Sequence, residues 1–180
     1  MPGWIKAYVR GVEKLNYWVG RFAMYLLFFL MGLQLLSSLR KMVDIPYSFW
    51  KDFPIPDPAI WTLEMSQFTL MGYIFLGGAY SIQLGSNVRM DLAYGQWSDR
   101  TRTIVDAISI FALIFYLGVL LYGGLSATGY ALEYGERNPT GWRPYMAPIK
   151  IILVIGIVLM LLQATALFFR DFAKLRGEEI

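Results

Sequence analysis

The stretch "MSQFTLMGYIFLGGAYSIQLGSNV", residues 65–88, carries no charged side chain and lies between Glu64 and Arg89. An α-helix needs about 20 apolar residues to cross the hydrocarbon core of a bilayer. The stretch therefore predicts a transmembrane helix. It stops at Arg89, with Asp91 two residues further along the chain.

Three other charge-free stretches of similar length occur in the 180 residues, of which 57% are hydrophobic and 16% charged. None shows the alternation of apolar and polar residues expected of a transmembrane barrel, and a continuous helix satisfies every backbone group inside a bilayer. The sequence predicts an all-α integral membrane protein, a single membrane domain over residues 1–180. The four predicted transmembrane helices cover approximately residues 15–39, 65–88, 107–132 and 150–169.

The distribution of Lys and Arg predicts the orientation of these helices. Ten of the 16 basic residues fall in the N-terminal tail, the 89–106 connection and the C-terminal tail, and six fall in the other two loops. Basic residues accumulate on the cytoplasmic side, so both termini are expected in the cytoplasm. Arg40 and Lys41, at the exit of the first helix, run against this bias.

The segment "WIKAYVRGVEKL", residues 4–15, separates apolar from basic positions at helical spacing. This pattern fits an amphipathic helix lying in the membrane interface. It fits equally well an extension of the first transmembrane helix into the cytosol, and the sequence leaves both alternatives open. The first apolar run is longer than a signal-peptide core, so it is expected to remain as an anchor.

The composition excludes several classes of function. The chain has no Cys and no His, which removes thiol catalysis, disulfides and His-based haem or metal sites. The predicted membrane helices have no charged residue in their cores, and no constellation of acid, base and nucleophile is evident. We expect no enzymatic activity, no cofactor and no metal site.

Glu64 directly precedes the second predicted membrane helix. Its position suits a helix start, where a negative charge is favoured. The alternative is an ion-coupling group in a small exporter or channel that assembles from copies of this chain. Small residues, among them Gly77 and Gly78 in the second helix, predict close helix packing.

The residues from 61 to 106 resemble the small membrane subunit, DctQ-like, of tripartite ATP-independent periplasmic (TRAP) transporters. The resemblance rests on a Trp followed by Glu, a Gly- and Ala-containing apolar stretch, a Val-Arg-x-Asp segment, and arginines before an aspartate. These features are Trp61, Glu64, Gly77, Ala79, Val88, Arg89, Asp91, Arg100, Arg102 and Asp106. A second segment, "GERNPTGWRPYMAPIKIILVIGIVLMLLQATALFFRD", residues 135–171, resembles the closing part of the family.

The resemblance implies a non-catalytic subunit of a sodium-coupled importer of organic acids, in the cytoplasmic (inner) membrane of a bacterium or archaeon. Its implied partners are a large multi-helix transport subunit, a periplasmic substrate-binding protein and membrane lipid, and no nucleic acid. Glu64, Arg89 and Asp91 would fix the second helix against its neighbours. Asn87 stands where many members have His, and because an amide does not titrate, a helix-end role is expected there. A membrane sensor or assembly factor without a transport role is the third alternative.

Overall fold

The computed structural model describes residues 3–43, 57–85 and 99–175, without the side chains of several residues at the start of α5 and the end of α6. The elements are α1 (Gly3–Met42), α3 (Pro58–Gln83), α5 (Asp99–Glu133) and α6 (Ala147–Leu175). The described residues contain no strand, so the prediction of an all-α chain with four long helices is confirmed.

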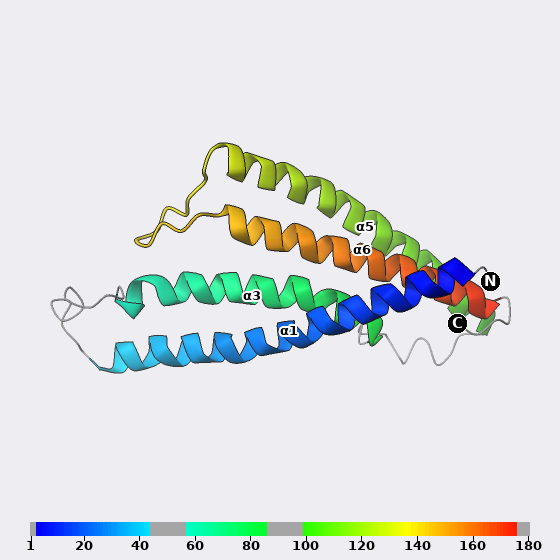
Figure 1. Ribbon diagram of the computed structural model, residues 1–180, viewed down its shortest axis with the longest axis horizontal. Helices are drawn as coiled ribbons and strands as arrows, with labels where there is room; N and C mark the ends of the chain where they lie inside the picture. The colour runs from blue at the N-terminus through cyan, green and yellow to red at the C-terminus, as the bar shows by residue number, and fades with distance from the viewer. Residues whose placement is uncertain (1–2, 44–56, 86–98, 176–180) are drawn as a thin grey trace.

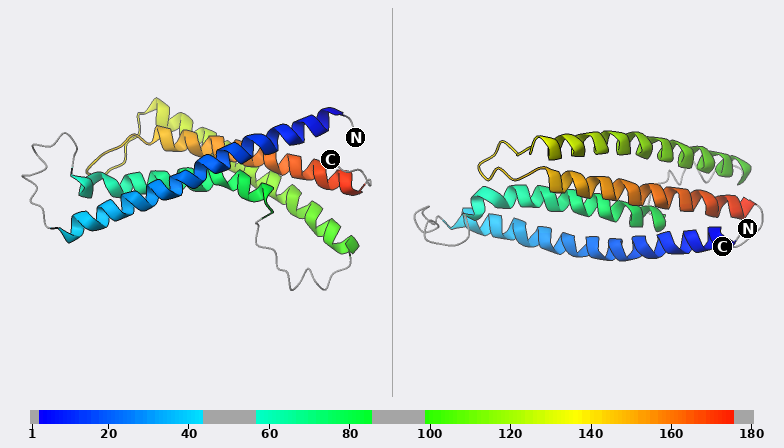
Figure 2. Two further views of the ribbon diagram at one scale, coloured as in Figure 1. Left: turned by 60° about the horizontal axis from the view of Figure 1, so that its bottom comes forward. Right: turned by 45° about the horizontal axis from the view of Figure 1, so that its top comes forward.

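The helices form two antiparallel hairpins, α1 with α3 and α5 with α6 (Figure 1). The hairpins join where α3 packs on α6, and α1 also crosses α6. One end of the bundle holds the end of α1, the start of α3 and residues 134–146, and we call it the hairpin end. The other, which we call the terminal end, holds the start of α1 and the end of α6 (Figures 1 and 2).

Three of the helices are long and apolar enough to cross a membrane: α1, residues Ile108–Glu133 of α5, and Ala147–Asp171 of α6. Helix α3, the predicted second span, is not among them. It carries buried polar residues, including Thr62, Glu64, Ser66 and Thr69. Helix α3 packs on both α1 and α6, so it can carry these polar side chains buried inside the bundle.

Helix α1 is continuous from Gly3, well before the predicted start near residue 15. Its first turns place Ile5, Val9 and Val12 in a buried cluster with Ala166 of α6. The apolar face of residues 4–15 therefore packs on α6. The structure favours the extension of the first helix over a separate interfacial helix.

Helix α3 begins seven residues before the predicted position, at Pro58. Asp57 is its N-cap and accepts a hydrogen bond from the backbone N–H of Ala59 at 3.0 Å. A Pro at the first helical position loses no hydrogen bond there. The helix ends at Gln83, and Gly85 follows with a φ of 65°, the left-handed conformation that suits Gly after a helix.

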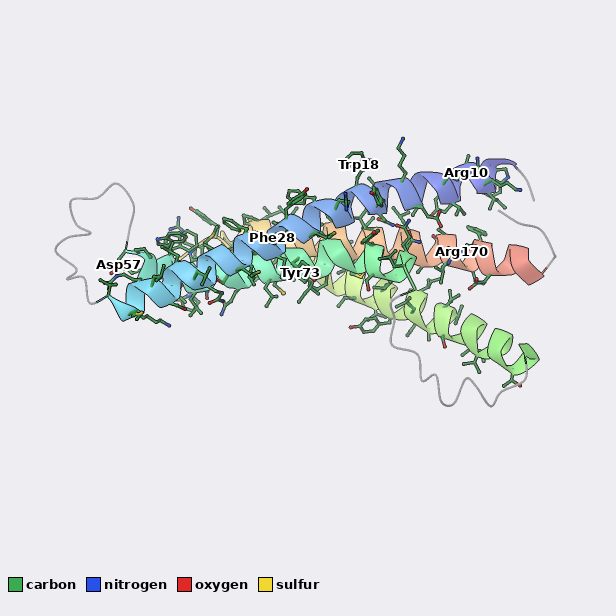
Figure 3. The ribbon with its side chains drawn as sticks, turned by 90° about the horizontal axis from the view of Figure 1, so that it is seen from below. Arg10, Trp18, Phe28, Asp57, Tyr73 and Arg170 are labelled. Atoms are coloured by element: carbon green, nitrogen blue, oxygen red, sulfur yellow. The ribbon has the colours of Figure 1, made fainter. Side chains whose placement is uncertain are left out.

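Large apolar side chains cover the outside of the bundle. Phe28 and Trp18 on α1 and Phe111 and Tyr122 on α5 are all more than half exposed; Figure 3 shows the first two on the outer side of α1. Soluble proteins rarely expose contiguous apolar surface of this extent. This surface is suited to lipid and to other membrane helices.

Candidate functional site

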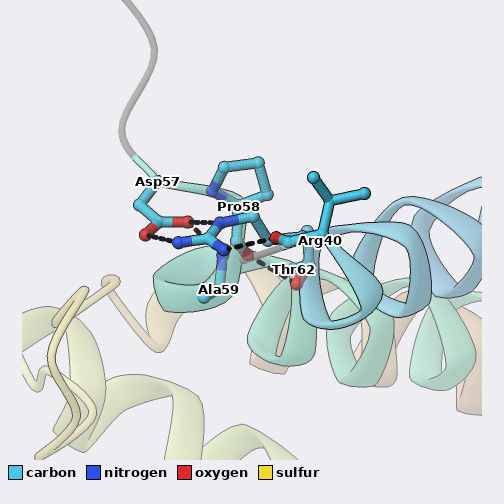
Figure 4. Close-up of polar contacts among 6 residues, drawn as sticks. Arg40, Asp57, Pro58, Ala59 and Thr62 are labelled. Atoms are coloured by element: carbon cyan, nitrogen blue, oxygen red, sulfur yellow. Dashed lines mark hydrogen bonds and ion pairs between the residues drawn. The ribbon is translucent and has the colours of Figure 1, made fainter. Parts of the chain in front are cut away.

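The hairpin end is held by an ion pair between Arg40, near the end of α1, and Asp57. Arg40 Nε lies 2.9 Å from Asp57 Oδ1, and a second guanidinium nitrogen donates to Oδ2 at 3.0 Å (Figure 4). The same guanidinium donates to the backbone carbonyl of Val43 at 3.2 Å. Both side chains are largely buried, so the pair connects the end of α1 to the start of α3 across residues 44–56.

The Arg40 guanidinium, through its hydrogen bonds, holds the pKa of Asp57 below its ordinary value. Partial burial raises the pKa, and the Ala59 N–H bond lowers it further. Asp57 therefore carries a negative charge at neutral pH and neutralises Arg40. This pairing explains why Arg40 runs against the charge bias of the sequence: its charge is satisfied within the chain.

Glu64 lies inside α3, six residues after Pro58, so the prediction that it opens the helix is wrong. The carboxylate at the helix start is Asp57. Glu64 is only 4% exposed, and its Oε2 has no hydrogen-bond partner among the described residues. Trp61, one turn earlier, is half-buried.

The hydroxyl groups around Glu64 are satisfied by their own helix. Thr62 donates to the carbonyl of Pro58 at 2.6 Å, Ser66 to that of Thr62 at 2.7 Å, and Thr69 to that of Met65 at 2.7 Å. These polar residues can be buried without a partner on another helix. Glu64 is the member of the group that keeps an unsatisfied oxygen.

The predicted small residues of α3 are used in packing within the chain. A Cβ at Gly78 would lie 2.8 Å from Met160 Sδ of α6, and one at Gly77 would lie 3.7 Å from Ala23 Cβ of α1. The backbones of α3 and α6 also approach closely at Gly156, where a Cβ would lie 2.6 Å from the Phe75 carbonyl oxygen. Gly77 and Gly78 thus explain how α3 fits between α1 and α6.

Helix α5 also carries small residues that remain open. Gly118, Gly123 and Gly129 have no neighbour within 4 Å of an added Cβ. Gly123 and Ala127, four residues apart on α5, line an apolar groove of about 460 Å³ together with Tyr116 of α5 and residues of α3 and α6. Helix α5 packs mainly on α6, so the face that carries Gly123 and Ala127 is available to another helix.

The connection between α5 and α6 is internally bonded. The Met146 N–H donates to the Glu136 carbonyl at 2.9 Å, and the Asn138 N–H to that of Pro144 at 3.0 Å. The Arg137 guanidinium lies 4.0 Å from the ring centroid of Tyr145, and Lys150 pairs with Glu136. These contacts give residues 134–146 a defined shape at the hairpin end.

The terminal end contains polar contacts that the sequence did not reveal. Tyr8 hydrogen-bonds Thr165 at 2.8 Å, and Arg170 lies 3.5 Å from Glu13. Asn16 and Gln163, both fully buried, share a hydrogen bond of 2.7 Å. Asn16 follows Ile5, Val9 and Val12 at helical spacing. Its position on this apolar face was the feature of the sequence that could have predicted its burial.

The charged motif of the resemblance lies largely outside the described part of the chain. Arg89 and Asp91 are outside the described residues. Arg100, Arg102 and Asp106 belong to the first turns of α5, where their side chains are not described. Their proposed contacts remain predictions.

The family described as "Tripartite ATP-independent periplasmic transporters, DctQ component" matches residues 50–174. Comparisons with curated proteins and with solved structures gave no significant match. The family match covers more than half of the 180 residues and includes α3, α5 and nearly all of α6. The chain therefore belongs to the DctQ family and is a small membrane component of a TRAP transporter.

Proposed function

We propose that this chain is a non-catalytic scaffold for the large transport subunit of a sodium-coupled TRAP importer of organic acids. Its hairpin end would face the periplasm and help dock the substrate-binding protein. Family membership supports a role within such a transporter. The observation that carries the scaffold role is the open α5 face, because its small residues would let another helix approach closely.

The interior of the bundle also supports an auxiliary role. Around Glu64, the hydroxyl groups are satisfied within their own helix. We assign coupling to sodium and selection of the substrate to the partner polypeptides.

The scaffold role is tested by co-purification in mild detergent. We expect Gly123→Leu and Ala127→Leu to reduce recovery of the large subunit, because each fills the approach surface on α5. Gly32→Leu is the matched control, since Gly32 on α1 also has no neighbour within 4 Å. Equal recovery for all three variants would contradict the assignment of the α5 face.

The proposed orientation has both termini in the cytoplasm and α3 as the fourth span. The chain has no Cys, so the labelling of a single introduced Cys shows on which side of the membrane that position lies. We expect a membrane-impermeant maleimide to label Thr140→Cys in intact spheroplasts and Gly11→Cys only after permeabilisation. Both positions are exposed in the structure. The opposite labelling pattern would show that both termini lie in the periplasm.

The buried Glu64 keeps a second candidate function open, an exporter or channel formed by copies of this chain. Its unsatisfied Oε2 is the observation that favours it, because ionisable residues within membrane segments often lie on ion paths. Liposomes containing only this chain distinguish the two functions. The scaffold predicts no ion flux; flux that Glu64→Gln abolishes would support the exporter.

A further inference from the structure

Two fully buried amide side chains connect α1 to α6 inside the bundle. Asn16 Nδ2 donates to Gln163 Oε1 at 2.7 Å, and both residues are 0% exposed. This bond uses one polar atom of each amide. Asn16 Oδ1 and Gln163 Nε2 are buried without a hydrogen-bond partner among the described residues.

Helix α3 contributes a third amide at the same level. Helices α3 and α6 run in the same direction (Figure 1), and Gly78 packs against Met160. Gln83 lies five residues beyond Gly78, and Gln163 lies three residues beyond Met160. At 1.5 Å per residue, the two Gln residues are within one helical turn of each other along the bundle.

The register of α1 gives the same result. This helix runs antiparallel to α3, and Gly20 packs against Tyr80. Asn16 lies four residues before Gly20, and Gln83 lies three residues after Tyr80, so they too share a level. Gln83 also follows the fully buried Ala79 by four residues, on the same face of α3.

Gln83 Oε1 is likewise buried and has no hydrogen-bond partner among the described residues. The junction of α1, α3 and α6 thus contains two unsatisfied acceptors, on Asn16 and Gln83, and one unsatisfied donor group, on Gln163. Leaving such groups unpaired away from water costs free energy. If the amides of Asn16 and Gln163 are both turned over, the set still has two acceptors and one donor group.

We propose that these three amides bind one buried water molecule that joins α1, α3 and α6. The water donates its two hydrogens to Asn16 Oδ1 and Gln83 Oε1 and accepts a hydrogen bond from Gln163 Nε2. Three hydrogen bonds are typical of a buried protein water. A cation fits the set less well, because the Gln163 N–H group would point towards it.

A dry junction and a junction with a bound water predict opposite effects of Gln83→Met. In a dry junction, Gln83→Met removes an unsatisfied buried acceptor and leaves thermal stability unchanged or raised. With a bound water, the same change removes one of its three partners. We expect Gln83→Met to lower the Tm of the purified full chain by about 2–4 °C.

The effect should depend on the other two amides. In an Asn16→Leu, Gln163→Met background the water has already lost its site, so adding Gln83→Met should cause no further decrease in Tm. Gln67→Met is the matched control, because Gln67 is exposed on the same helix. No decrease for Gln83→Met, or an equal decrease in both backgrounds, would overturn the proposal.

A density map of the chain in its transporter complex gives a second, independent test that needs no variant. The expected result is a peak within hydrogen-bond distance of all three amides. Direct contact between the Gln83 amide and the other two, with no peak between them, would also overturn the proposal.

Discussion

Arg40 and Asp57 form a two-point ion pair that joins the end of α1 to the first residue before α3. The same carboxylate caps α3 through the Ala59 N–H. Asp57 therefore has two structural roles, one within its own helix and one between helices. Substitutions that preserve only one of these roles can separate them.

Asp57→Ala should destabilise the folded chain by about 1–3 kcal/mol, because it removes an N-cap and leaves the largely buried Arg40 without its carboxylate. Asp57→Asn should cost less, since Asn is also a good N-cap. Thermal unfolding of the purified chain measures the order of the two variants. Lys41→Ala, at an exposed neighbouring position, should have little effect. Equal stability of both Asp57 variants and the wild type would contradict a stabilising role for the Arg40–Asp57 ion pair.

The lowered pKa of Asp57 also predicts how stability depends on pH. A carboxyl group whose pKa is lower in the folded state stabilises the fold above its unfolded value, here 3.8. That contribution is lost as the pH falls below 3.8 and through the lower folded pKa. The Tm difference between the wild type and Asp57→Asn should therefore be constant near neutral pH and shrink below about pH 4. A difference that grows on acidification would have the wrong sign.

The start of α3 shows why the sequence located helices better than their ends. A charge-free run identifies the apolar part of a helix, and it correctly placed a helix over most of 65–83. The helix itself begins at the residue whose neighbour can cap its first backbone N–H groups, which here is Asp57 before Pro58. Asp57 followed by Pro58 is a recognisable start signal, but it lies outside the charge-free run from which the helix was predicted.

Partners of buried polar residues were harder to predict than helices. Gln163 was recognisable as the polar residue of an otherwise aliphatic segment, yet its partner Asn16 is on the first helix, far away in the sequence. The pairing depends on the crossing and rotation of α1 against α6. Neither quantity follows from the periodicity of a single helix.

Gly156→Ala should disrupt the contact between α3 and α6. Its Cβ would lie 2.6 Å from the carbonyl oxygen of Phe75, and backbone atoms cannot move aside as a flexible side chain can. Overpacking of this kind typically costs about 1–3 kcal/mol. Thermal unfolding should show a lower Tm for Gly156→Ala, whereas Gly129→Ala, which meets no neighbour, should be neutral or slightly stabilising.

Tyr8→Phe tests whether the first turns of α1 are anchored on α6. The variant keeps the ring next to Phe169 but removes the hydroxyl bonded to Thr165, at a cost of about 0.5–1.5 kcal/mol. We expect faster tryptic cleavage at Lys6 and Arg10 than in the wild type. Tyr25→Phe is the control, because Tyr25 is 69% exposed on the same helix; identical cleavage of all three proteins would favour an interfacial segment independent of α6.

The charged pair Arg89 and Asp91 carries the last prediction, which comes from the sequence and family membership. If Arg89 only anchors a helix end at the membrane surface, Lys should replace it, because both side chains extend to the interface. If Arg89 makes a planar, two-point contact with a carboxylate of the large subunit, Lys cannot reproduce it. We expect Arg89→Lys, Arg89→Ala and Asp91→Ala each to reduce sodium-dependent uptake by the reconstituted transporter, while substrate affinity of the binding protein stays unchanged. Full uptake with Arg89→Lys would indicate that Arg89 only anchors the helix at the membrane. Full uptake with both Ala variants would contradict a role for Arg89 and Asp91 in the interface with the large subunit.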